Sequence, residues 1–144
     1  KMLIRDILKG KGNKVFTASQ NTTIGEISST LAKENIGAIV ITEGDKVVGI
    51  LSERDIVRGF TQQNESVRNT KAKELMTKNV ITCTHEDSSE ELLDLMVKKH
   101  FRHMPVIEKD KLIGVISIGD LVKDRTKRLK KEIDHLKTYV TKSY

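Results

Sequence analysis

The stretch "GILSERD" at Gly49–Asp55 recurs as "GVISIGD" at Gly114–Asp120. Each copy contains a glycine, a short apolar run, a serine and, three positions after the serine, an aspartate. The apolar runs are β-rich and the residues that follow favour helix, so Ser52 and Ser117 are predicted to lie where a strand gives way to a helix. A pattern that occurs twice at the same kind of junction indicates an internal repeat.

The repeat extends well beyond these two stretches. A shift of 65 positions aligns residues 15–57 with residues 80–122, and eleven of the aligned positions are identical. The preceding segments also match, "IRDIL" at 4–8 with "AKELM" at 72–76, although the first copy carries three extra residues within "KGKGNK" at 9–14. Two copies are too few for a solenoid, so we expect two half-domains that pack face to face about a pseudo-twofold axis.

Each copy is predicted to have the element order β-α-β-β-α, because helical and strand-like apolar patterns alternate along it. The expected fold class is therefore α/β (α+β), with two repeats packed through their sheets. The expected strands are 15–17, 38–42 and 47–52 in the first copy and 80–82, 103–108 and 112–117 in the second, with helices at 23–34 and 88–99. The expected domains are residues 1–60 (first repeat), 61–71 (polar linker), 72–122 (second repeat) and 123–144 (basic amphipathic helix).

The net charge of +6 over 144 residues is concentrated at the C-terminal end. Residues 123–142 contain eight Lys or Arg and three Asp or Glu, so the remainder is close to neutral. Aromatic residues make up only 3% and Trp is absent, which argues against a stacking platform for single-stranded nucleic acid. A lone Cys83 and the lack of a long apolar run predict a cytoplasmic protein, or one of an organelle matrix, without membrane association.

The Ser-x-x-Asp pattern has two interpretations that do not exclude each other. In one, the serine accepts a hydrogen bond from the N–H three residues on, and the aspartate returns one to the serine N–H, as in a capping box. In the other, the aspartate faces a cleft and accepts from the vicinal hydroxyls of a ribose, while the helix N-terminus attracts phosphate. Gly49 and Gly114 favour the second, because glycine inside a strand suggests that something approaches the backbone closely.

The tandem β-α-β-β-α unit, with two G-h-h-S-x-x-D endings (h, apolar) and "HMPV" in one copy, resembles a pair of CBS domains (a Bateman module). The resemblance covers residues 4–122, and the run "FRHMPVIEKDKLIGVISIGDLV" is highly specific for the family. With its basic C-terminal helix, the chain is similar to the small stand-alone CBS-pair proteins of bacteria and organelles. No catalytic cofactor and no metal site is expected.

The resemblance implies two clefts, each able to hold an adenine nucleotide (AMP, ADP, ATP or NAD-type) or an S-adenosyl compound. The first cleft would be lined by Ser52, Asp55, Val80, Ile81, Thr82, Arg102, His103, Met104 and Pro105. The second cleft would be lined by Ser117, Asp120, Phe16, Thr17, Ala18, Gly37, Ala38 and Ile39.

The two clefts differ in charge. The second repeat has Arg102 and His103 where the first has Gly37 and Ala38, so the first cleft is expected to hold phosphate more strongly. Arg54, whose counterpart is a glycine, is a candidate to compensate in the second cleft.

These features predict a non-enzymatic regulatory module that binds adenine nucleotides and signals to an unknown target through rearrangement of a homodimer. Leu129, Ile133, Leu136 and Val140 are spaced four, three and four apart, which favours helix–helix contact across such a dimer. Two alternatives stay open at this point: a dimerisation scaffold with vestigial clefts, and a nucleic-acid binder acting through the basic helix. No nucleophile, metal site or carboxylate pair typical of an enzyme stands out.

Overall fold

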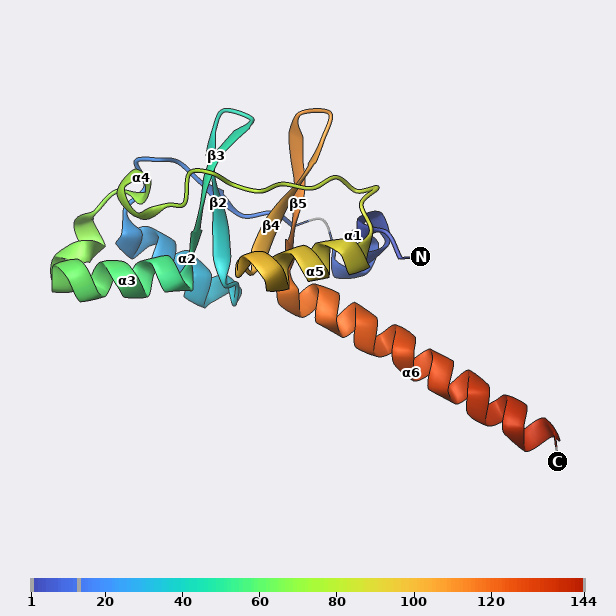
Figure 1. The fold of residues 1–144 in the computed structure, drawn as a ribbon. Coiled ribbons are helices and arrows are strands. Elements are labelled where there is room, and N and C mark those ends of the chain that lie inside the picture. Colours follow the sequence, from blue (N-terminus) through green and yellow to red (C-terminus); the bar gives the residue numbers. More distant parts are fainter. Residues whose placement is uncertain (1, 13, 144) are drawn as a thin grey trace. The chain divides into compact units, whose positions relative to one another are not determined.

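The computed structural model describes residues 2–12 and 14–143, with side chains up to Val140. The predicted α/β class is confirmed, and the chain ends in a long helix (Figure 1). The elements in chain order are α1 (Ile4–Lys11), β1 (Thr17–Ala18), α2 (Ile24–Glu34), β2 (Ala38–Glu43), β3 (Lys46–Ser52), α3 (Glu53–Gln63), the 3-10 helix η1 (Asn64–Asn69), α4 (Ala72–Leu75), α5 (Ser89–Lys99), β4 (His103–Glu108), β5 (Lys111–Ser117) and α6 (Ile118–Ser143).

The chain divides into two compact units that do not coincide with the two sequence repeats. The helical unit comprises residues 2–12, 84–103 and 116–143, and the sheet unit comprises residues 14–83 and 104–115. The segment that precedes each repeat has been exchanged: α4, which leads into the second copy, packs in the unit of α2, and α1, which leads into the first, packs in the unit of α5. This exchange explains why the polar segment between the copies does not separate two independent domains.

Main-chain bonds fix the exchange in the same way in both units. In the sheet unit Thr23 and Lys71 form an antiparallel bridge, and the Ile24 N–H donates to the Thr70 carbonyl at 2.8 Å. In the helical unit Leu3 and Ser88 form the matching bridge. Each bridge joins a lead-in segment to the loop before the other copy's first helix and so provides hydrogen-bond partners for backbone groups of that loop.

The core of the sheet unit lies between α2 and the sheet β1-β2-β3. Strand β2 pairs in parallel with β1, through Thr17↔Val40, and antiparallel with β3. The apolar stripe predicted for α2, Ile24, Ile27 and Leu31, is buried against Ile39, Ile41 and Leu51 of the strands. Thr23 caps α2, its hydroxyl accepting from the Glu26 N–H at 3.2 Å.

Strand pairing in the second copy is shorter than expected. The strand predicted at 80–82 is absent, and only Cys83 bridges β4, opposite Val106. Pro105 is the reason, because it stands where the first copy has Val40, the partner of Thr17, and a proline has no N–H to donate to a parallel neighbour. The remaining bonds run from the Cys83 N–H to the Pro105 carbonyl (3.0 Å) and from the Ile107 N–H to the Cys83 carbonyl (2.8 Å). In the first copy the strand predicted at 15–17 is displaced to Thr17–Ala18.

Two further boundaries differ from the sequence prediction. Residues 61–63 continue α3 and residues 64–69 form η1, so most of the polar stretch 61–71 is helical. Its single valine, Val67, is only 2% exposed and joins the core of the sheet unit. The C-terminal helix begins at Ile118, directly after Ser117, so one helix crosses the boundary placed at 122/123. Tyr144, the predicted end of that helix, lies outside the described residues.

Gly49 is required by packing within the chain. A Cβ at this position would lie 2.5 Å from the Met76 sulfur and 3.1 Å from the Thr77 carbonyl oxygen. The close approach expected from this glycine is therefore that of the segment after α4, which also forms a two-way backbone bridge with Ile50. Gly49 thus supports the exchanged packing, and it is no evidence for a ligand.

We expect Gly49→Ala to lower the free energy of unfolding by about 1–3 kcal/mol, because the added methyl overpacks the contact with Met76 and Thr77. Urea unfolding followed by circular dichroism measures the change. Gly10→Ala is the control, since no atom lies within 4 Å of a Cβ built there and the residue is helical. It should stabilise by a few tenths to about 1 kcal/mol. Equal stability of Gly49→Ala and wild type would contradict the packing role.

Candidate functional site

The first Ser-x-x-Asp forms the start of α3. The Ser52 N–H donates to Asp55 Oδ2 at 2.9 Å, and the Ser52 hydroxyl donates to the same oxygen at 3.1 Å. The Asp55 N–H lies 3.4 Å from the serine oxygen, which completes the capping box. The Asp55 side chain is 11% exposed, and Arg58 Nη1 approaches Oδ1 only to 3.8 Å. The capping interpretation is therefore realised, with a largely buried carboxylate at a helix N-terminus.

The second Ser-x-x-Asp repeats this geometry at the start of α6 and adds a cation. The Ser117 N–H donates to Asp120 Oδ2 at 2.9 Å, and the Asp120 N–H donates to the serine hydroxyl at 3.0 Å. The Lys11 ammonium, at the end of α1 in the same helical unit, donates to Oδ2 at 2.7 Å. Asp120 is 24% exposed and Lys11 39% exposed, so the pair is partly screened by solvent.

Asp120 is more acidic than an ordinary aspartic acid. Burial by itself raises its pKa, but the hydrogen bond from Lys11, the Ser117 N–H, the positive charge of Lys11 and the Ser117 hydroxyl together outweigh burial and lower it. Asp120 is therefore ionised at neutral pH, as a carboxylate must be if it is to act purely as an acceptor.

The other residues predicted for the two clefts are divided between the units. Arg102 and His103 belong to the helical unit, together with Ser117 and Asp120. The sheet unit holds all the others: Phe16, Thr17, Ala18, Gly37, Ala38, Ile39, Ser52, Arg54, Asp55, Val80, Ile81, Thr82, Met104 and Pro105.

Within each unit, a main-chain bond ties the beginning of a β-strand to the beginning of the helix that follows its hairpin. In the sheet unit the Glu53 N–H donates to the Gly37 carbonyl at 3.0 Å, and Ala38 pairs with Ser52. In the helical unit the Ile118 N–H donates to the Arg102 carbonyl at 2.8 Å. The backbone of Gly37 thus lies beside Ser52, and that of Arg102 beside Ser117, although the sequence prediction placed them in opposite clefts.

The predicted cations and some of the apolar residues predicted for the clefts are open to solvent. The side chains of Arg54 and Arg102 are exposed, whereas His103 is half-buried. Of the apolar candidates, Ile39 and Met104 are buried, at 2% and 0%, and Ile81 is 40% exposed. Arg54 and Arg102 are accessible to an anion, and Ile39 and Met104 belong to the hydrophobic core.

A hollow of about 570 Å³ lies within the sheet unit, near the turn that joins β2 to β3. Its lining residues are Glu43, Asp45, Lys46, Val47, Lys78, Val80, Thr82, Ile107 and Asp110. It includes Val80 and Thr82 of the predicted first cleft, but neither Ser52 nor Asp55, which lie at the other end of β3. Three carboxylates face two lysines there, so its charge does not suit a phosphate group.

Lys11 is the polar residue of the site that sequence reasoning missed. The available signal was the three-residue difference between the lead-in segments, since "KGKGNK" makes α1 eight residues long against four for α4. That extra helical turn carries Lys11 to Asp120. The second copy has no equivalent extension, so the two Ser-x-x-Asp sites are not equivalent in charge.

We expect Lys11→Met to raise the pKa of Asp120 toward the ordinary aspartate value, since it removes both the hydrogen bond and the charge. Carbon-13 NMR of the Asp120 carboxyl across a pH titration measures the change. Lys9→Met is the matched control, because Lys9 is in the same last turn of α1 and forms no ion pair with Asp120 in the described part of the chain. Identical titration of Asp120 in all three proteins would contradict the ion pair.

The same variant has a pH-dependent effect on stability. A carboxylate whose pKa is lowered by folding stabilises the native state above its unfolded pKa, and this stabilisation is lost as the pH falls through the folded value. The free energy of unfolding of wild type should exceed that of Lys11→Met by no more than about 1 kcal/mol at pH 7, because the ion pair is partly exposed. The difference should disappear in acid once Asp120 is protonated.

Neither a metal-binding cluster nor a helix able to cross a membrane occurs among the described residues. Residues 2–12 and 14–143 contain no grouping of three or more His, Cys, Asp or Glu side chains that could hold an ion. No helix in these ranges combines the length and the apolar character that a transmembrane span needs.

Comparison with known proteins agrees with the resemblance noted in the sequence. The chain is 30% identical over 150 residues to the CBS domain-containing protein CBSX3, mitochondrial, of Arabidopsis thaliana, covering 98% of this chain and 73% of that protein. The crystal structure of the CBS-domain protein ATU1752 from Agrobacterium tumefaciens superposes with a TM-score of 0.83 at 39% identity, covering 86% of this chain and 99% of the other.

A second solved structure contains ligands. It is the CBS domain pair of protein MJ0100 in complex with 5'-methylthioadenosine and S-adenosyl-L-methionine, with a TM-score of 0.77 at 28% identity, covering 88% of this chain and 98% of the other. Stand-alone CBS-domain proteins are usually non-catalytic regulatory modules. The CBS domain model matches residues 4–61 and 72–126 of this chain. The chain therefore belongs to the CBS domain family and is a tandem CBS-domain pair, a regulatory module.

Proposed function

We propose that this CBS pair is a non-enzymatic sensor of adenine nucleotides, of the AMP, ADP, ATP or NAD type, with Asp55 and Asp120 as the acceptors for ribose. One observation carries the proposal. In both copies the serine N–H binds Oδ2 of the aspartate, and Oδ1 makes no hydrogen bond within the described part of the chain. A second carboxylate oxygen in a fixed orientation is the group that a ribose hydroxyl needs as its acceptor.

Three features support the nucleotide class. A structural relative holds two adenosyl compounds, 5'-methylthioadenosine and S-adenosyl-L-methionine. The N-termini of α3 and α6 carry partial positive charge beside the two aspartates, which favours phosphate oxygens. Arg54 and Arg102 are exposed and therefore accessible to an anion. The binding residues proposed are those predicted from the sequence for the two clefts.

The proposed output is a change in the arrangement of two protomers, read by a target protein. A nucleotide can produce such a change only by binding one arrangement more tightly than the other. A tenfold difference in affinity shifts the equilibrium between arrangements by about 1.4 kcal/mol. The two sites need not contribute equally, because Lys11 donates a 2.7 Å hydrogen bond to Asp120, whereas Arg58 approaches Asp55 only to 3.8 Å.

Isothermal titration calorimetry with AMP, ATP and NAD on ligand-stripped protein tests the proposal. Wild type should release or absorb heat with at least one of them, and Asp55→Asn and Asp120→Asn should each weaken one site by about tenfold or more, since a hydrogen bond to a charged group contributes about 1.5–3 kcal/mol. The corresponding 2'-deoxynucleotide should bind wild type more weakly than the ribonucleotide by a similar factor.

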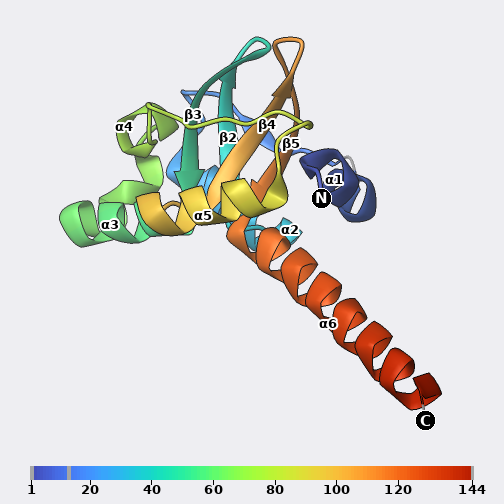
Figure 2. The same cartoon turned by 45° about the vertical axis from the view of Figure 1, so that its right-hand side comes forward.

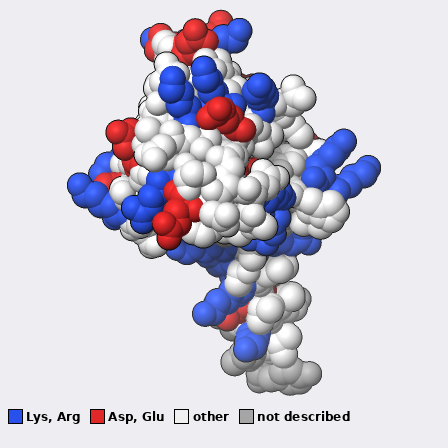
Figure 3. Space-filling model, turned by 90° about the vertical axis from the view of Figure 1, so that its left-hand side faces the viewer, with Lys and Arg blue, Asp and Glu red and all other residues white. Residues whose placement is uncertain are grey.

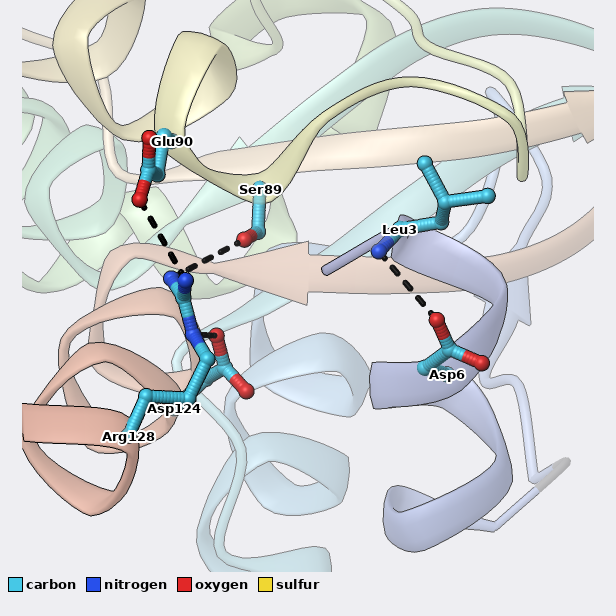
Figure 4. Close-up of polar contacts among 6 residues, drawn as sticks. All are labelled: Leu3, Asp6, Ser89, Glu90, Asp124 and Arg128. Carbon is cyan, nitrogen blue, oxygen red and sulfur yellow. Dashed lines mark hydrogen bonds and ion pairs between the residues drawn. The ribbon is translucent and has the colours of Figure 1, made fainter. Parts of the chain in front are cut away.

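Asp6→Asn is the matched control. Asp6 stands third in α1 and its Oδ2 accepts from the Leu3 N–H at 3.2 Å, the same capping role without the preceding serine (Figure 4). Its substitution should leave the calorimetric titration unchanged. Absence of heat with all three nucleotides on folded wild type would reject the sensor and favour a scaffold with vestigial sites.

A further inference from the structure

Among the residues with described side chains, helix α6 is anchored to its own unit near its beginning. Leu121 is 1% exposed, and Arg128 is held by Asp124 at 3.0 Å, Glu90 at 3.3 Å and Ser89 at 3.5 Å (Figure 4). From residue 129 to residue 140 every side chain is exposed. In both ribbon views this part of α6 runs away from α5 (Figures 1 and 2).

This exposed half carries an apolar seam. Leu129, Ile133, Leu136 and Val140 are 49–61% exposed and are spaced four, three and four residues apart. They fall on one side of the helix, on average roughly 100° from Leu121 and Arg128 by the 3.6-residue turn. The exposed stretch 129–140 would be only marginally stable as a helix in water unless its apolar side is covered. The seam therefore lies on a side that the anchor to α5 does not use.

The identity of the seam residues indicates what covers them. With the heptad register that places Leu129 and Leu136 at position d, the seam continues toward the N-terminus through Val122 at d. The residues at position a are then all β-branched: Thr126, Ile133 and Val140. β-Branched residues at a with leucine at d favour a parallel pair of helices over larger assemblies.

The flanking charges distinguish the direction of pairing. All three e positions are lysine, at 123, 130 and 137. In an antiparallel pair e residues face e residues, so lysine would meet lysine in any register. In a parallel pair Glu132 at g faces Lys137 at e of the other helix, and this happens twice by symmetry, although Arg125 and Lys130 repel. The balance of charges favours the parallel arrangement.

We propose that α6 pairs with α6 of a second copy of this chain as a parallel, in-register two-stranded coiled coil along Val122, Thr126, Leu129, Ile133, Leu136 and Val140. The pairing specifies the dimer contact on which the output of the proposed function depends. Asp120 lies one helical turn or less before Val122, so the coil begins at the residue proposed to receive ribose. Lysines at 123, 130 and 137 flank the seam at position e, as Arg125 does at position g. Figure 3 shows Lys and Arg interspersed with acidic and uncharged residues on one face of the molecule.

Disulfide trapping in a glutathione buffer tests the direction of pairing without any nucleotide. Thr126→Cys and Val140→Cys, made singly, should each form a covalent dimer within the same time. They lie two heptads apart, about 21 Å along the helix at 1.5 Å per residue. An antiparallel pair can bring at most one of them next to its own symmetry mate. Cross-linking at only one position, or at neither, would overturn the proposal.

Two controls exclude non-specific cross-linking. Lys131→Cys, at the outer position f, should remain monomeric on a non-reducing gel. Wild type should do the same, because its own Cys83 is buried at 4% exposure.

Light scattering tests the same contact independently. Wild type should have twice the chain mass of 16.3 kDa. Ile133→Glu should have the mass of one chain, and its circular dichroism spectrum should show that the protein remains folded. Lys131→Glu, the same charge change on the outer face, should stay dimeric. A wild-type monomer, or an Ile133→Glu dimer, would overturn the coiled coil. A monomer whose α6 binds DNA with a steep salt dependence would assign the helix to nucleic acid instead.

Discussion

The fold of each half depends on a hydrogen bond from a serine N–H to the aspartate three residues later. The bond is 2.9 Å long in both copies, between Ser52 and Asp55 and between Ser117 and Asp120. It ends a β-strand, begins a helix and fixes the direction in which that helix leaves the sheet. It also holds a carboxylate at the positive end of the helix, with one oxygen engaged and the other available. Local folding and the proposed chemistry therefore use the same residue.

Around this shared element the two copies differ in structure. An extra turn of α1 brings Lys11 to Asp120, whereas Asp55 has only the distant guanidinium of Arg58. Pro105 in place of Val40 reduces the parallel pairing of the second copy to a single bridge at Cys83. The helix that follows Asp55 stops at Gln63, while the helix that follows Asp120 continues to Ser143 and carries the exposed seam. The second copy alone therefore carries the apolar seam for which we propose pairing with a second chain.

The repeats and the capping boxes could be predicted from the sequence, because each local pattern occurs twice and the two copies support the same interpretation. The period of 65, the apolar stripe of α2 and the serine at each strand-to-helix junction predicted the α/β repeats and the capping boxes. The exchange of α1 and α4 between units was not readable, since a lead-in helix of four to eight residues carries no signal of which sheet it joins. The interpretation of Gly49 as a sign of a ligand was wrong for the same reason, because the group that approaches its backbone is Met76, a tertiary neighbour. The polar stretch at 61–71 contains one valine, Val67, that is buried in the core and lies in η1.

The predicted cleft residues could not be derived from local sequence patterns, because they depend on family resemblance and on the spatial relation of segments far apart in sequence. The two aspartates at the centre of the proposal, Asp55 and Asp120, nevertheless belong to local motifs and can be tested directly. Carbon-13 NMR of the Asp55 and Asp120 carboxyl groups during separate titrations with AMP, ATP and NAD reports on new hydrogen bonds to each carboxylate. The account predicts that at least one of these two resonances shifts and saturates with the binding isotherm, while the Asp6 resonance does not move. Resonances that stay in place at millimolar AMP, ATP and NAD alike would contradict it.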